Sequence, residues 1–503
     1  MNRPDASGAL TQEAVSNVGW QALVMGSNLL LKALVLIALA RLMPPAEFGL
    51  IAAATVIISL AADFSQIGVH RALIQRLVLD TAHVRSAFAI ALLTGMSVAG
   101  LLYSAAPAMA GLLGIAETRP LIEFLALTLV ISGISEVSAS LLQRDRQFRV
   151  LGLIDLGSYF TGFACVALPL AFMGYGAWAL AIGQMAQVIA RMAALFMVRL
   201  PAMALVPRWR ESKDLLIPGA GFSAGQIGNF LATQADYFLV GRFLGAEALG
   251  LYSRAYQLFM LPAQMFGKVV ATVLFPTFSA IQDQPERIGR AYLSALGVTA
   301  LVILPTSAAM IILAPELVGF LLGDNWQGIV APFQVLVITL LFRTSYKLSD
   351  AVVLATGSMY RRALTQYLYA AAVVGGSLAG LPFGLAGVAA GVGAAVVFNH
   401  AMTLTLARRN TGLAWGVLLL AQVRQVPGAA VIAAPVWLAA RWARAEGLPD
   451  LAVLAAGGMA GAMAAAAAWW LARPLFGAEA DWLASLLNSR LAKWKGRRAR
   501  GRS

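Results

Sequence analysis

The sequence predicts an all-α protein that crosses a membrane about 14 times, and three observations carry this prediction. Of the 503 residues, 60% are hydrophobic and only 12% are charged, whereas a soluble protein carries about a quarter charged residues. Apolar runs of roughly 20 residues, the length needed to span a bilayer, recur along the whole chain. The basic residues lie in short clusters between these runs, a pattern of membrane topology rather than of nucleic-acid binding.

The apolar runs form a group of six, a second group of six and a final pair. The expected spans are 18–42, 49–69, 86–106, 121–142, 150–172 and 175–198, then 215–241, 250–275, 291–313, 332–356, 363–381 and 384–406, and last 426–443 and 451–472. They predict a first six-helix bundle over 1–213 and a second over 214–412. An additional transmembrane pair is expected over 413–472, followed by a basic tail over 473–503.

Positive charge is divided unevenly between the two sets of loops. One set, together with both ends of the chain, holds most of the Lys and Arg, and the opposite set holds only Arg41, Arg119, Arg242, Arg441 and Arg444. Because cytoplasmic loops carry the excess of Lys and Arg, both termini are expected in the cytoplasm. The first apolar run is too long for a cleavable signal peptide. The tail either lies amphipathically on an anionic leaflet or is a disordered basic segment.

The two groups of six carry an internal repeat at a constant offset of 201 residues. The matching pairs include Asn28 with Asn229, Arg41 with Arg242 and Gly49 with Gly250. Six helices separate the copies, so both copies enter the membrane in the same direction. Such parallel repeats are typical of transporters with a substrate site between the halves. Channels also use repeats, so the pattern favours transport without excluding a channel.

Polar side chains at membrane depth are costly, and each is therefore a candidate functional residue. Asn28 and Lys32 share one face of the first span. The equivalent seventh span presents Asn229 and Asp236. Lys268 lies well inside the eighth span and is a weaker candidate for the same cavity.

The tenth span carries the sharpest polar pattern. Arg343, Lys347 and Asp350 stack at i, i+4 and i+7 on one helical face. Two cations one turn apart repel each other unless an anion lies beside them. Asp350 is expected to neutralise one cation, and a phosphate-bearing ligand could neutralise the other. The alternative is a purely structural network of salt bridges between helices.

Four acidic residues are candidates for ion coupling: Asp63, Glu136, Asp236 and Asp350. Glu136 is either a protonation site or a packed, hydrogen-bonded carboxyl group, and Asp63 either pairs with Lys32 or caps its helix. Arg191 and Asp155 are expected to form a structural ion pair.

Three arginines mark the repeated turn. Arg41 and Arg242 are expected at the external membrane edge, where they anchor helix ends or take part in gating. Arg254 enters the next helix, where it could pair with Asp236.

Motifs for phosphate binding and for zinc-dependent hydrolysis are lacking. The sequence has no phosphate-binding G-x-x-x-x-G-K-[ST] loop and no H-E-x-x-H motif. Its single Cys165 excludes an internal disulfide, and its three histidines show no metal-binding spacing. No cofactor or metal is therefore expected, and an enzyme is poorly supported.

Three runs of sequence carry a family resemblance. They are ARLMPPAEFGLIAAATVIISLAADFSQIGVHRALIQR, LLQRDRQFRVLGLIDL and DYFLVGRFLGAEALGLYSRAYQLFMLPAQMFGKVVATVLFPTFSAIQ. They resemble polysaccharide flippases of the multidrug/oligosaccharidyl-lipid/polysaccharide exporter superfamily. The resemblance covers the first half and the start of the second, and it fades after about 410.

The resemblance implies two six-helix bundles around a cavity that opens alternately to either side of the bacterial inner membrane. The implied substrate is an undecaprenyl-pyrophosphate-linked oligosaccharide, and a polysaccharide polymerase and export machinery are implied partners. Lipid II flippases of the superfamily also have a thirteenth and a fourteenth helix, which here either hold the lipid tail or only anchor the protein. The alternatives are a drug or small-molecule:cation antiporter of the same superfamily and, in another class, a membrane glycan polymerase or ligase.

Overall fold

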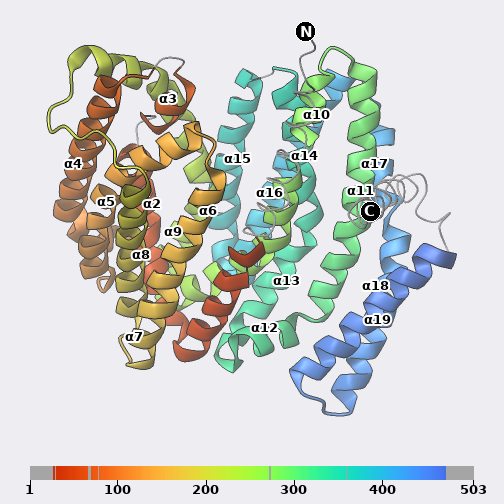
Figure 1. Ribbon diagram of the computed structural model, residues 1–503. Helices are drawn as coiled ribbons and strands as arrows, with labels where there is room; N and C mark the ends of the chain where they lie inside the picture. Colours follow the sequence, from red (N-terminus) through yellow and green to blue (C-terminus); the bar gives the residue numbers. More distant parts are fainter. Residues whose placement is uncertain are drawn as a thin grey trace, which may run out of the picture. The chain divides into compact units, whose positions relative to one another are not determined.

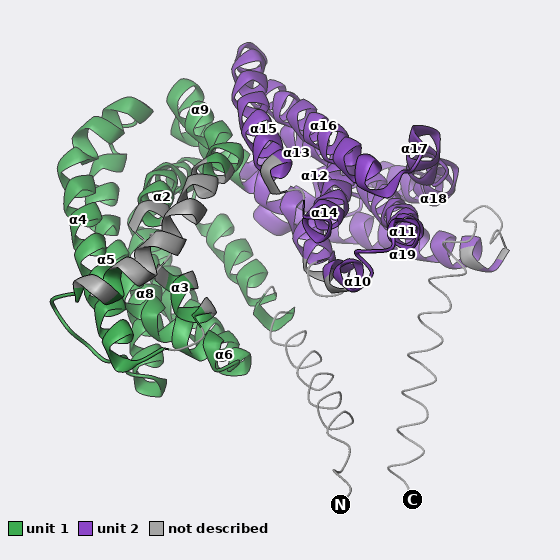
Figure 2. Ribbon diagram, turned by 90° about the horizontal axis from the view of Figure 1, so that it is seen from above, with its two compact units in different colours: residues 1–253 green, residues 254–503 purple. Residues whose placement is uncertain are grey.

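A computed structural model of the chain describes residues 26–28, 30–65, 69–76, 79–270, 274–357 and 359–471. Nearly all of this is helical, and the described residues contain no β-strand (Figure 1). The chain divides into two compact units, residues 1–253 and 254–503 (Figure 2). The boundary lies inside one long helix. The expected bundle boundaries at 213 and 412 stay predictions.

The first unit is built from helices around α4 and α5. A helical stretch over 30–42 precedes α2. The others are α2 (Pro45–Ser65), α3 (Val69–Gln75), α4 (Thr81–Leu113), α5 (Thr118–Arg144), α6 (Phe148–Tyr159), a π-helical turn (Phe160–Ala167), α7 (Leu168–Phe172), α8 (Ala177–Val198) and the first part of α9 (Trp209–Val269). One apolar cluster joins α3, α4 and α5, and a second joins α5, α6 and α8.

The second unit contains the end of α9 and the helices that follow it. These are α10 (Phe275–Ala280), α11 (Pro285–Ile312), α12 (Ala314–Leu322), α13 (Val330–Ile338), α14 (Leu340–Ala355), α15 (Met359–Gly380), α16 (Gly384–Thr411), α17 (Trp415–Val423), α18 (Val426–Ala445) and α19 (Asp450–Leu471), with 3-10 turns at Asp324–Ile329 and Leu381–Phe383. Its core lies between α10, α11, α14, α16 and α17. Within it, Tyr292 and Ser349 share a hydrogen bond of 2.7 Å.

The predicted membrane spans correspond to helices wherever the structure describes them. Among the described residues, nine helical runs are long and apolar enough to cross a bilayer, and ten when the bent α13–α14 pair is included. One of these runs, Arg361–Thr411, contains both α15 and α16. The first expected span lies partly outside the described residues. The polytopic all-α architecture is confirmed.

Local sequence signals define several helix ends. Asp80 caps α4 by accepting a hydrogen bond of 2.9 Å from the backbone N–H of His83, which satisfies one of the unpaired donors of the first turn. At the other end of α4, Gly114 adopts a left-handed conformation with φ 71°, as is common at helix C-termini. Gly245, with φ 87° and ψ −179°, breaks α9 at the turn between the expected seventh and eighth spans.

The expected tenth span, 332–356, is not one straight helix. It is broken at Thr339 into α13 and α14, which are bent by 44°. The break places the polar stack of residues 343–350 on its own short helix, separate from the apolar α13. Hydropathy averages over several turns and therefore does not reveal such a bend.

The additional helix pair is packed firmly within the second unit. Val436 and Ala440 of α18 belong to the same buried cluster as Leu313. At one edge of this cluster, the guanidinium of Arg444 donates two hydrogen bonds, 2.6 and 2.9 Å, to the buried carboxylate of Glu316 on α12. The pair is thus fixed to α11 and α12 by both apolar and ionic contacts.

Candidate functional site

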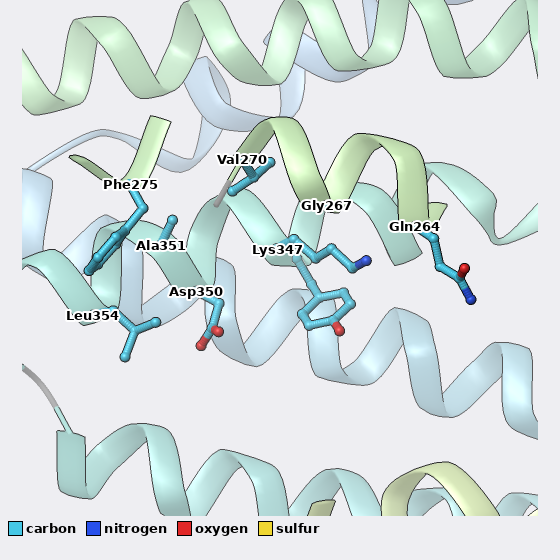
Figure 3. Close-up of a pocket in the computed structure, with 9 residues that line it drawn as sticks. Gln264, Gly267, Val270, Phe275, Lys347, Asp350, Ala351 and Leu354 are labelled. Carbon is cyan, nitrogen blue, oxygen red and sulfur yellow. The ribbon is translucent and has the colours of Figure 1, made fainter. Parts of the chain in front are cut away.

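An open pocket of about 640 Å³ lies in the second unit between the end of α9, the start of α10 and α14. Lys347 and Asp350 extend from α14 and Gln264 extends from α9 (Figure 3). Tyr346 and Phe275 add aromatic surface. The pocket therefore combines cationic, acidic, amide and aromatic groups from three helices.

Arg343 lies one helical turn from Lys347 and is only 5% exposed. Its guanidinium donates a hydrogen bond of 2.9 Å to the hydroxyl of Tyr369 on α15. It also lies over the ring of Tyr346, 5.4 Å from the ring centroid, which is within cation–π range. Its Nε finds no hydrogen-bond acceptor among the described residues. Arg343 is thus a buried cation held by neutral aromatic side chains.

Lys347 lines the pocket and extends from α14 to the backbone of α9. Its ammonium donates a hydrogen bond of 2.8 Å to the carbonyl of Ala263. A Cβ atom built on Gly267 would lie 2.5 Å from the same Nζ atom. A larger residue at position 267 would therefore require the end of the Lys347 side chain to shift.

Asp350 does not neutralise Arg343 or Lys347, and this expectation was wrong. Its carboxylate is bound in bidentate fashion by Arg362 of α15, with N–O distances of 2.5 and 3.0 Å. The planar guanidinium matches both carboxylate oxygens, and Arg362 comes from the neighbouring helix. The expected stack of two cations and one carboxylate is therefore two cations beside a separate ion pair between Asp350 and Arg362.

The balance of charge in this region is positive. In the part of the chain that the structure describes, no carboxylate forms an ion pair with Arg343 or Lys347. A buried charge without a counter-ion is costly. The arrangement offers the ammonium of the pocket-lining Lys347 to an anionic group, with the buried Arg343 one helical turn away.

The candidate residues of the first expected span lie in the first unit. Lys32 is exposed, and its ammonium lies 5.4 Å from the ring centroid of Tyr159 at the end of α6. The side-chain oxygen of Asn28 is buried without a hydrogen-bond donor among the described residues. The side chains of three further candidates, Asp63, Asn229 and Lys268, lie outside the described residues.

Glu136 belongs to an ion network that joins four helices of the first unit. Arg191 of α8 donates to Glu136 at 3.1 Å and to Asp155 of α6 at 3.0 Å. His70 of α3 lies 3.4 Å from the other oxygen of Glu136. The expected Arg191–Asp155 pair is confirmed, and Glu136 is part of the same network.

Asp236 is buried in the first unit and accepts a hydrogen bond of 2.8 Å from the hydroxyl of Tyr252. Arg254 donates to the side-chain oxygen of Gln257. Its expected pairing with Asp236 stays a prediction.

The two arginines of the repeated turns are exposed. Arg242 lies beside Gly114, where a built Cβ atom would be 2.9 Å from its Nη1 atom. A cation at this position complements the C-terminal end of the α4 dipole. The anchoring interpretation fits Arg242.

The sequence does not indicate two of the contacts between helices. The first is the pairing of Arg362 with Asp350, and the second involves Glu47 of α2. Glu47 accepts a hydrogen bond of 2.6 Å from the backbone N–H of Ala177 and so caps α8 from a distant segment. The sequence gives no signal for either contact, because each depends on how separate helices pack.

Comparison with known proteins assigns the family. A family model described as "Polysaccharide biosynthesis protein" matches residues 38–331. The chain belongs to this family. The match includes the three runs that carry the resemblance, and the family resemblance is thereby confirmed.

Known proteins of similar sequence share only part of their length with the chain. The lipopolysaccharide biosynthesis protein WzxC of Escherichia coli K12 is 24% identical over 67% of this chain and 68% of its own length. The succinoglycan biosynthesis transport protein ExoT of Rhizobium meliloti is 29% identical over 62% and 63%. The teichuronic acid biosynthesis protein TuaB of Bacillus subtilis is 28% identical over 58% and 60%.

Solved structures show the same fold. The lipid II flippase MurJ matches with a TM-score of 0.69 and 13% identity, over 89% of this chain and 98% of its own. A multidrug resistance MATE family transporter matches with a TM-score of 0.59 and 15% identity, over 76% and 94%. At such identities the likeness describes the fold alone.

Proposed function

We propose that the chain moves undecaprenyl-pyrophosphate-linked oligosaccharide repeat units across the bacterial inner membrane by alternating access, for the synthesis of a surface polysaccharide. The observation that carries this proposal is a pair of cations on α14, Lys347 at an open pocket and Arg343 buried one helical turn away, with no carboxylate paired to either among the described residues. A pyrophosphate group supplies the missing negative charge. Arginine in particular suits the geometry of phosphate oxygens.

The comparisons support the same conclusion. The family description concerns polysaccharide biosynthesis, and the name of ExoT describes a transport protein. The fold is shared with a protein described as a lipid II flippase. We therefore infer transport rather than catalysis.

The aromatic and amide groups of the pocket suit the saccharide part of such a ligand. Tyr346 and Phe275 offer flat apolar surfaces, and Gln264 offers a donor and an acceptor for hydroxyl groups. A cationic drug is less suited to this site, because the cations would repel it. Both termini lie in the cytoplasm in this proposal, and a polysaccharide polymerase receives the repeat units on the outer side.

The proposal is tested in a strain that lacks the gene and is complemented with variants. We expect lipid-linked repeat units to remain on the cytoplasmic side without the chain, and the wild type to restore polysaccharide export. Arg343→Gln and Lys347→Gln should reduce export roughly tenfold or more, because a hydrogen bond to a charged group contributes about 1.5–3 kcal/mol. Arg361→Gln is the matched control, since Arg361 is an exposed arginine of α15.

Abundance in the membrane and elution on gel filtration distinguish loss of function from loss of folding. Lys347→Gln is the safer variant, because Lys347 is only half-buried. Normal export by both variants would refute the site. Repeat units that reach the outer leaflet without the chain would refute the function.

A further inference from the structure

The two turns of the internal repeat touch each other directly in the first unit. A Cβ atom built on Gly49 of α2 would lie 1.7 Å from the carbonyl oxygen of Ala246. A Cβ atom built on Gly250 of α9 would lie 1.8 Å from the carbonyl oxygen of Pro45. The two backbones are therefore in contact, and no residue larger than glycine fits at either position without a shift.

This contact obeys the symmetry of the repeat. Pro45 and Ala246 are separated by the offset of 201 residues, and so are Gly49 and Gly250. Gly49 thus meets Ala246, which lies one helical turn before Gly250. Gly250 in turn meets Pro45, which lies one helical turn before Gly49. A crossing of this kind links equivalent parts of the two copies.

The chain is broken at the same place in both copies. The helical stretch 30–42 ends just before α2 begins at Pro45. In the second copy, α9 is interrupted at Gly245, with φ 87° and ψ −179°, and continues at Ala246. Each crossing helix therefore begins at a break in the backbone, where φ and ψ can change without disturbing a helix.

The neighbours of the crossing are braced against other helices. Glu47 of α2 accepts a hydrogen bond of 2.6 Å from the N–H of Ala177, at the start of α8. On the other side of the break, Arg242 lies against Gly114 at the end of α4. These contacts hold α2 and Arg242, and Gly245 lies between Arg242 and the crossing at Gly250. Gly245 is therefore the point at which α9 can bend without disturbing these contacts.

We propose that the Gly49–Gly250 crossing is a closing contact of the transport cycle, and that Gly245 is its hinge. The backbones of α2 and of α9 after Gly245 separate to open the outer side, and they meet again to close it. The placement on the outer side follows from the charge distribution of the loops. Hinge residues at the end of an element commonly absorb such changes in φ and ψ. The inference rests on the proposed transport function.

The contact is tested by cross-linking the two turns. In a Cys165→Ser background, Pro45→Cys and Ala246→Cys are joined by a short, reducible bis-thiosulfonate reagent. We expect cross-linking to abolish polysaccharide export and a reducing agent to restore it. The control is Ala372→Cys with Ala395→Cys, which continues the register of the Gly376–Gly391 and Gly380–Gly387 contacts between α15 and α16. This hairpin need not open, so export should persist after cross-linking there.

A second measurement uses Ala246→Cys as the single cysteine, in the same Cys165→Ser background. It does not depend on the double variant. Labelling by a membrane-impermeant maleimide should be greater in cells that synthesise repeat units than in cells that do not. Equal labelling would contradict an opening of the crossing.

The possible failures are distinguishable. Continued export by the cross-linked turns, or failure of the turns to cross-link, would overturn this inference and leave the proposed function in place. Failure of the wild-type chain to restore export would overturn the proposed function, and this inference with it.

Discussion

Arg343, Arg191 and Arg444 illustrate three ways of holding an arginine within a helical protein. Arg343 is bound by tyrosines, Arg191 bridges two carboxylates, and Arg444 binds one carboxylate through two nitrogens. The charges of Arg191 and Arg444 are compensated by carboxylates among the described residues. Arg343 lies one helical turn from the pocket-lining Lys347 and has no acidic partner among the described residues, and for this reason we propose a role for it in binding.

The spacing of side chains within a helix could be predicted from the sequence, whereas ion pairs between helices could not. The spacing of Arg343 and Lys347 on one helix is set by the helical period, and it was predicted from the sequence. The partner of Asp350 was not, because Arg362 belongs to the next helix. Glu316 and Arg444 are separated by 128 residues. Such pairs depend on tertiary packing, which no local pattern encodes.

The Glu316–Arg444 ion pair predicts a dependence of stability on pH. Burial raises the pKa of the Glu316 carboxyl, but the hydrogen bonds and the charge of Arg444 outweigh it and lower the pKa below its usual value. The stabilisation is therefore present above the pKa of the unfolded state, about 4.3. It is lost as the pH falls from there through the lower pKa of the folded state.

We expect the Tm of the wild type in detergent to exceed that of Glu316→Gln at pH 7. The difference should shrink as the pH is lowered below about 4.3. A difference in Tm that grows toward acid pH would contradict the assignment.

Helices α15 and α16 show how elements of this fold pack. Gly376 meets Gly391 and Gly380 meets Gly387, with built Cβ atoms 1.9 to 2.4 Å from the opposite carbonyl oxygens. Small residues let two membrane helices approach closely. The helices themselves were predictable from hydropathy, whereas the bend at Thr339 and the short α17 were not. Neither feature changes the average polarity of its surroundings.

Two adjacent glycines of α15 give a matched prediction at this scale. Gly376→Ala should lower the free energy of unfolding by about 1–3 kcal/mol, because the backbones must move apart. Gly375→Ala should leave it unchanged or raise it by up to about 1 kcal/mol, because alanine favours a helix. A Cβ atom on Gly375 meets nothing within 4 Å. Equal destabilisation of both variants, measured by thermal or denaturant unfolding in detergent, would contradict the packing.

At the scale of the whole molecule, the internal repeat and the distribution of positive charge were the most informative features of the sequence. The repeat pointed to equivalent turns, and the structure shows Gly49 and Gly250 of those turns in contact. Composition and charge predicted the class of protein because a bilayer imposes the same requirements on every chain that crosses it. The arrangement of the pocket could not be predicted, since it combines residues of α9, α10 and α14.

The charge distribution predicts the topology. Alkaline phosphatase is active only on the outer side of the inner membrane, so a fusion after Gly114 should be active. A fusion after Arg146, within a basic loop, should be inactive, and a fluorescent protein at the C-terminus should fold in the cytoplasm. The reverse pattern of activities would show that the chain has the opposite orientation.

Transport of a lipid-linked pyrophosphate oligosaccharide by the purified chain in proteoliposomes is the most direct test of the proposed function. The saccharide that appears on the opposite leaflet is measured by its accessibility to an added glycosidase. We predict that the wild type accelerates this movement over protein-free vesicles, and that Lys347→Glu abolishes the acceleration while Arg361→Gln retains it. Movement no faster than in protein-free vesicles, with folded wild-type protein present, would contradict the account.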